Sequence, residues 1–203
     1  MLKQTLLVAA LVGLSSAAFA GPVTVKLGAS VVDITGKSDL ANGAVKNAQA
    51  TDVVAFTPSI DYRIGETPFS AEILLANPMK HTVKTDSGNI ASLKQLPPTL
   101  TVKYNSPEYK GFSGYVGAGA TVFTPWDVKG EGALANAEVK AKTAVGPAAQ
   151  IGVNFKPDTS KNWGVFADAR YADLKTDVQV GGQSVGKLKL NPVVYTLGYS
   201  VNF

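Results

Sequence analysis

The sequence predicts an all-β protein, an eight-stranded antiparallel transmembrane β-barrel with short periplasmic turns and longer extracellular loops. Three observations predict this fold class: segments of alternating polarity recur along the chain, short and long connections alternate between them, and aromatic residues gather at one end of the segments. Strands that cross a bilayer are about 9 to 11 residues long, and in barrels they alternate lipid-facing with lumen-facing side chains.

The alternating segments are the first of these observations. In the last one, Tyr195, Leu197 and Tyr199 share one face, while small or polar residues occupy the other. The eight segments are Val23 to Ile34, Val53 to Ile64, Pro68 to Ala76, Leu96 to Tyr104, Phe112 to Phe123, Lys142 to Lys156, Asn162 to Leu174 and Leu188 to Phe203.

The connections alternate in length, as they do in outer-membrane barrels. The short ones, predicted to be periplasmic, are Gly65 to Thr67, Asn105 to Gly111 and Pro157 to Lys161. The longer ones, predicted to be extracellular loops, are Thr35 to Asp52, Asn77 to Gln95, Thr124 to Ala141 and Lys175 to Lys187.

Aromatic residues with outward parity lie at the periplasmic ends of the segments, which is typical of an aromatic girdle at the headgroup level. They are Tyr62, Phe69, Tyr104, Phe112, Phe155, Trp163 and Phe203. A soluble barrel with a core of rings is the alternative, but such a core would not confine its rings to one rim.

The first twenty residues have the pattern of a signal peptide, with Lys3, an apolar stretch from Leu6 to Leu14, and a small-x-small site at Ala18-Phe19-Ala20. We therefore expect residues 1–20 to be a signal peptide cleaved after Ala20, and residues 21–203 to be one barrel domain exported through the periplasm to the bacterial outer membrane. The sequence has no cysteine, which excludes disulfides and thiolate metal sites.

Inward parity predicts what fills the barrel, and an eight-stranded barrel has room for side chains or one small ligand. Lower in the lumen we expect charges, which favour an ion-pair network over a proton relay or ion filter: Lys26, Asp61, Arg63, Lys103, Asp168 and Arg170. The predicted apolar channel comprises Val32, Ile34, Leu74, Gly117, Gly119, Leu174, Leu188, Leu190 and Val194. These residues could instead simply pack the barrel mouth.

Two consecutive prolines, Pro97 and Pro98, begin the fourth segment. Proline has no backbone donor for a strand ladder, so we expect either a structural bulge or a lateral opening in the wall at this point.

Catalytic and metal sites are not predicted. The only histidine, His81, lies in a predicted loop with no paired nucleophile, and the loop aspartates lack ligand spacing. We expect no cofactor, and no nucleic-acid binding because no basic stripe is interleaved with aromatic residues.

The chain resembles the outer membrane protein W family in Leu96-Pro97-Pro98-Thr99-Leu100, in Tyr115-Val116-Gly117-Ala118-Gly119 and in Pro78, Lys80 and His81. Its last residues, including Tyr199, Val201 and Phe203, resemble the terminal signal that the barrel-assembly machinery reads in outer-membrane proteins. The resemblance implies a barrel with a narrow apolar channel for small hydrophobic molecules and a lateral exit.

The expected partners are thus outer-membrane lipid and lipopolysaccharide, the barrel-assembly machinery and a small hydrophobic solute. The alternative function is a structural or surface-recognition barrel with a filled lumen, whose loops bind host, phage or bacteriocin ligands. A lipid-modifying enzyme and a soluble periplasmic carrier are further, less favoured alternatives.

Overall fold

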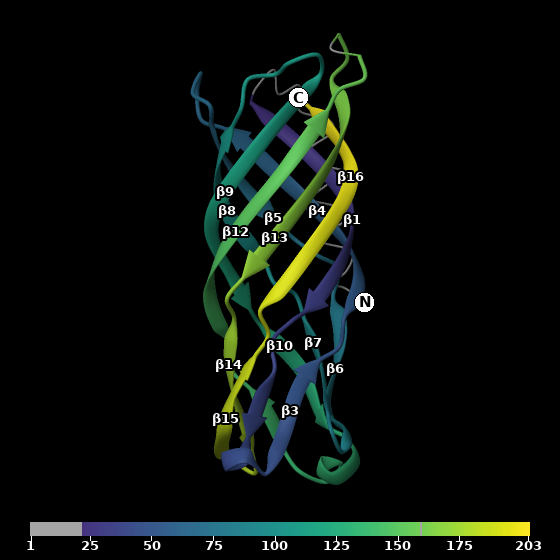
Figure 1. The fold of residues 1–203 in the computed structure, drawn as a ribbon, viewed down its shortest axis with the longest axis vertical. Helices are drawn as coiled ribbons and strands as arrows, with labels where there is room; N and C mark the ends of the chain where they lie inside the picture. Colours follow the sequence, from purple (N-terminus) through teal and green to yellow (C-terminus); the bar gives the residue numbers. More distant parts are fainter. Residues whose placement is uncertain (1–21, 159) are drawn as a thin grey trace.

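The computed structural model describes residues 22–158 and 160–203 and contains a closed antiparallel barrel with the strand order β1-β16-β13-β12-β9-β8-β5-β4 (Figure 1). The predicted fold class is confirmed. The barrel strands are β1 (Val23–Ile34), β4 (Val53–Arg63), β5 (Phe69–Leu74), β8 (Thr99–Asn105), β9 (Phe112–Phe123), β12 (Ala144–Phe155), β13 (Trp163–Ala172) and β16 (Pro192–Asn202).

The barrel strands follow the predicted segments closely, and the main difference lies in the last one. The segment from Leu188 to Phe203 is divided, because Asn191 has a φ of +42° and β16 begins only at Pro192. A left-handed residue followed by a proline interrupts the ladder. Leu188 therefore belongs to a different sheet from the rest of its predicted strand.

The long connections are strands, not the loops that we expected. They form a five-stranded sheet, β10-β7-β6-β3-β2, and a three-stranded sheet, β11-β14-β15, which prolong the barrel beyond one end (Figure 1, lower half). Alternating side chains explain the difference, since Met79, His81 and Val83 of one connection are all buried.

The bounds of these outer strands are β2 (Ser38–Leu40), β3 (Val45–Ala50), β6 (Met79–Thr85), β7 (Gly88–Gln95), β10 (Pro125–Gly130), β11 (Val139–Ala141), β14 (Lys175–Val180) and β15 (Gln183–Lys189). Two short 3₁₀ helices, η1 (Ala41–Gly43) and η2 (Gly132–Leu134), complete this region.

The outside of the barrel is apolar. Leu100, Ile151 and Leu197 are each about 60 to 70% exposed, and many other large apolar side chains on the barrel strands are exposed too. A soluble protein rarely exposes so large an apolar surface, whereas a lipid-facing barrel wall requires it.

Aromatic rings line the rim formed by the short turns, where the sequence predicts a girdle. Phe112 stacks on Phe155 with ring centroids 4.4 Å apart, and Trp163 stacks on Tyr199 at 5.5 Å. No helix in residues 22–158 and 160–203 is long and apolar enough to cross a membrane. The predicted signal peptide and its cleavage after Ala20 lie outside the described residues.

Candidate functional site

An inner cavity of about 50 Å³ lies in the half of the barrel next to the outer sheets. Its apolar walls include six of the predicted channel residues, which three barrel strands and the adjoining chain place side by side. They are Val32, Ile34, Leu74, Leu174, Leu190 and Val194. The inward parity that groups these residues in sequence thus brings them together in space.

A second, larger cavity of about 270 Å³ lies between the two outer sheets, and apolar side chains line it. Leu40, Leu93, Val128 and Val180 are among them. Leu188, which the sequence assigned to the lumen, lines this outer cavity because it belongs to β15. Its predicted position is therefore corrected from the barrel bore to the region beyond it.

Buried apolar side chains separate the two cavities. Ile34, Phe123, Leu174 and Leu188 are each at most 2% exposed, and they belong to one continuous apolar core. The cavities are therefore joined only if these side chains change rotamer, a motion that occurs within folded proteins without breaking backbone hydrogen bonds.

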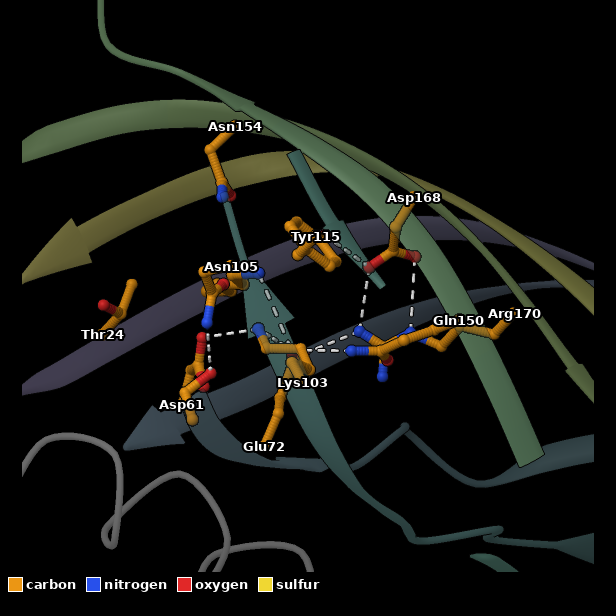
Figure 2. A network of polar contacts seen from close by, with 12 residues as sticks. Thr24, Asp61, Glu72, Lys103, Asn105, Tyr115, Gln150, Asn154, Asp168 and Arg170 are labelled. Atoms are coloured by element: carbon orange, nitrogen blue, oxygen red, sulfur yellow. Dashed lines mark hydrogen bonds and ion pairs between the residues drawn. The ribbon is translucent and has the colours of Figure 1, made fainter. Parts of the chain in front are cut away.

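Charged side chains fill the barrel below the inner cavity, and Figure 2 shows most of them. Glu72 is the centre of this network: it accepts from Lys103 and from Arg170 Nη2, the latter at 2.6 Å, and lies 3.7 Å from Lys26 Nζ. Three cations balance three carboxylates in what we call the charged plug: Lys26, Lys103 and Arg170 with Asp61, Glu72 and Asp168.

Aromatic rings and hydrogen bonds support the plug. The Tyr115 hydroxyl donates to Asp168 Oδ2 at 3.0 Å, and Lys26 Nζ lies 4.4 Å from the centre of the Tyr115 ring. Every carboxylate is paired, as buried charges must be to persist in a low-dielectric interior. The predicted ion-pair network is present, except that Arg63 is exposed at the rim.

Glu72, the central residue, is missing from the sequence-based prediction. It has the same parity as Leu74 two residues later, so alternation along β5 places both in the lumen. Parity was therefore sufficient to find it, whereas the hydrogen bond of Tyr115 to Asp168 on another strand follows only from the closed barrel.

A polar cavity of about 800 Å³ occupies the end of the barrel with the short turns, and Lys26, Asp61, Arg63, Asn154 and Lys156 line it. It lies on the opposite side of the charged plug from the inner cavity. The plug therefore divides the bore into a polar vestibule and an apolar cavity, and an apolar molecule in the inner cavity has no apolar path straight through.

The wall beside the inner cavity has a gap in its ladder. Strands β5 and β8 pair up to Leu74 and Thr99, and β6 and β7 resume the pairing at Met79 and Gln95. Among the described residues, no backbone hydrogen bond joins the intervening segments 75–78 and 96–98. We call this interruption the wall gap.

On each side of the wall gap, the backbone forms hydrogen bonds with the neighbouring strand away from the gap, β4 on one side and β9 on the other. Leu75 N donates to Pro58 O at 2.9 Å and Asn77 N to Phe56 O at 3.0 Å, whereas Pro98 O accepts from Val122 N at 2.9 Å. Pro97 and Pro98 have no N–H to donate across the gap. Pro97 also lines the inner cavity, so the gap and the cavity adjoin.

The model of the OmpW family matches residues 18–203, which is nearly the whole chain. This chain belongs to the OmpW family. Membership places it in the bacterial outer membrane, in contact with outer-membrane lipid, and the family is one of non-enzymatic barrels, in agreement with the sequence-based prediction.

A sequence relative supports the family assignment, and two solved structures have a similar fold. Outer membrane protein W of Vibrio cholerae is 30% identical over 223 residues, covering 100% of both chains. The crystal structure of OprG from Pseudomonas aeruginosa has a TM-score of 0.77 at 23% identity, covering 91% of this chain and 96% of that one. The solid-state NMR structure of AlkL has a TM-score of 0.65 at 24% identity, with 90% of each chain covered.

Inward parity suggested that Gly117 and Gly119 leave space in the channel of this OmpW-family barrel. The structure shows that they do not. A Cβ added at Gly119 would lie 1.9 Å from the carbonyl oxygen of Leu100, and one at Gly117 would meet Lys103 Cγ at 2.9 Å. Both positions are filled by the neighbouring strand and its side chains. Glycine at 119 lets β8 and β9 approach closely.

Replacing Gly119 by alanine is therefore expected to destabilise the barrel by about 1–3 kcal/mol, as overpacking against backbone does. Unfolding by urea in lipid vesicles measures the change. Gly114→Ala on the same strand is the matched control, since its added Cβ would have no atom closer than 3.9 Å. Equal stabilities of the two variants would contradict the close approach.

His81 is buried on β6 and uses both ring nitrogens in hydrogen bonds. Its Nδ1 lies 2.6 Å from Thr51 O, which only accepts, so Nδ1 carries the proton; Nε2 lies 2.8 Å from Gln95 Nε2 and accepts. The ring is therefore neutral, and burial lowers the pKa of His81 although Thr51 and Asp52 oppose the shift. No group of three or more His, Asp or Glu residues in the described ranges could hold a metal ion.

The depressed pKa of His81 predicts that stability falls with falling pH. Below the ordinary histidine pKa of about 6.5, His81 is protonated in the unfolded chain but stays neutral in the folded one. The free energy of unfolding therefore decreases as the pH falls, until the pH reaches the lower pKa of the folded state. Urea unfolding near pH 7.5 and near pH 5.5 measures the loss, which approaches about 1.4 kcal/mol per pH unit. His81→Gln should reduce this slope, and an unchanged slope would contradict the assignment.

Proposed function

We propose that this barrel takes up small apolar molecules passively from outside the cell and releases them sideways into the outer membrane. The observation that carries the proposal is the inner cavity, which is closed below by the charged plug but adjoins the wall gap at Pro97. In this proposal the solute enters through the outer cavity, reaches the inner cavity, and leaves through the wall gap into the membrane.

Physical chemistry favours apolar solutes on this route. Removing apolar surface from water stabilises a solute in such a cavity by roughly 25 cal/mol per Å². A sugar would have to leave its hydroxyl groups unpaired among Leu40, Leu93 and Val180, at a cost of several kcal/mol. The outer cavity therefore selects apolar molecules before they reach the barrel.

The exit through the wall is consistent with the strand ladder. Opening a paired wall would leave several backbone groups unsatisfied in lipid, each costing several kcal/mol. At the wall gap those bonds are already made to other strands, by Leu75, Asn77 and Pro98. The wall gap can therefore open by side-chain movement alone, without breaking a backbone hydrogen bond.

Blocking the inner cavity tests the proposal. Ala148 is buried on β12 and lines the cavity, so Ala148→Trp should fill it, whereas Ala118→Trp on β9 points outward and is the matched control. Purified variants in liposomes are compared for entry of a small apolar probe and of a sugar of similar size, against protein-free liposomes.

We expect protein-dependent entry of the apolar probe in wild type and in Ala118→Trp, a loss of at least about tenfold in Ala148→Trp, and no entry of the sugar. Equal entry into protein-free liposomes would overturn the uptake function. It would direct attention to ligand recognition by the outer strands, the alternative that the sequence left open.

A further inference from the structure

The floor of the inner cavity is polar. Thr101, Gln150 and Arg170 line it where the apolar walls meet the charged plug. Arg170 bonds Glu72 and Asp168 through Nη2 and Nε, which leaves Nη1, and Gln150 Nε2 reaches Glu72 at 3.4 Å, which leaves Oε1 (Figure 2).

Three buried polar atoms of this floor have no hydrogen-bond partner within the described part of the chain: Thr101 Oγ1, Gln150 Oε1 and Arg170 Nη1. Arg170 is 5% exposed, Gln150 5% and Thr101 1%. Buried polar groups are nearly always paired, so the three orphans on this cavity floor are free to hydrogen-bond a molecule that enters the cavity. One orphan donates, one accepts, and the hydroxyl can do either.

The charge balance limits what that group can be. The three cations of the plug are already matched by three carboxylates. A carboxylate head would add an uncompensated buried anion and would face the oxygen of Gln150, which repels it. A neutral hydroxyl accepts from Arg170 Nη1 and from the Thr101 hydroxyl and donates to Gln150 Oε1, so it can satisfy all three orphans.

We propose that the inner cavity binds short aliphatic molecules with one neutral oxygen-bearing head, above all primary alcohols, with the head on Thr101, Gln150 and Arg170 and the chain against Leu190 and Val194. The inference rests on the proposed function, because it names the substrate class of the same cavity. A site of about 50 Å³ holds about three to five non-hydrogen atoms, since one water needs roughly 10–15 Å³.

The test uses the full-length protein in lipid nanodiscs and three probes, 1-butanol, pentane and butanoate, compared at equal concentration in the bilayer. NMR shifts of the Leu190 and Val194 methyls report occupancy of the cavity, and the Gln150 side-chain amide reports contact with the head. We expect 1-butanol to bind about tenfold more tightly than pentane, as two net hydrogen bonds allow, and butanoate to bind least.

Two variants of similar size remove two of the three orphans. Thr101→Val and Gln150→Met should bring the affinity for 1-butanol towards that for pentane. The barrel should still fold, because the oxygens removed have no partner among the described residues and Gln150→Met gives up only the long 3.4 Å bond from Nε2 to Glu72. Thr99→Val is the matched control: its hydroxyl is paired with Thr121 at 2.8 Å, so it should keep the preference for the alcohol.

The outcomes separate the two proposals. Equal binding of 1-butanol and pentane at the same methyls would overturn the head-group site and leave the apolar cavity standing. A preference for the alcohol that survives in Thr101→Val and Gln150→Met would also overturn it. No methyl shift with any probe would instead overturn the proposed function, since the cavity would then admit no solute.

Discussion

Glu72→Gln is expected to destabilise the folded barrel by about 3–5 kcal/mol, which is the usual effect of leaving buried charges without their partner. Glu72 is fully buried and joins Lys26, Lys103 and Arg170, which come from three other strands. Glutamine keeps the size of the side chain but leaves a net positive charge in the plug.

Urea unfolding in lipid vesicles, followed by the fluorescence of Trp126 and Trp163, measures this change. The matched control is the double variant Glu72→Gln with Lys26→Met, which removes one charge of each sign, leaves Asp61 and Asp168 with their partners, and should recover much of the loss. Equal destabilisation of the single and double variants would show that the shape of Glu72, and not the charge balance, holds the plug together.

Alternation along the strands was sufficient to predict most of the barrel, because inward and outward positions differ so clearly in polarity. Tyr195, Leu197 and Tyr199 are exposed on the outside as expected, while Thr196 and Ser200 are buried inside. The same rule grouped Ile34, Leu74 and Leu174 around the inner cavity. These features depend only on the two-residue period of a strand.

What alternation could not predict depends on the three-dimensional course of the strands. Parity says that Gly119 faces inward, but not that the backbone of Leu100 already occupies the space beside it. Nor does it show that Leu188, beyond the break at Asn191, lines the outer cavity. The unpaired oxygens of Thr101 and Gln150 are likewise invisible in sequence, since pairing is a property of the closed barrel.

Replacing both Pro97 and Pro98 by valine is expected to slow uptake of an apolar probe by up to about tenfold while stabilising the barrel. Only the valine at 97 offers an N–H to segment 75–78, because the carbonyl of residue 98, and with it the N–H of that residue, faces β9. One new ladder bond would stabilise the closed wall by about 0.5–1.5 kcal/mol, and 1.4 kcal/mol corresponds to a tenfold change in the open population.

Uptake into liposomes and urea unfolding of the same preparations test this prediction together. Pro147→Val is the matched control, because Pro147 is exposed on β12, away from the gap, and pairs with Ala120. A closed exit predicts slower uptake only in the Pro97 and Pro98 variant. If that variant is stabilised yet transports at the wild-type rate, solutes leave the inner cavity by another path and the prolines serve only to bend the wall.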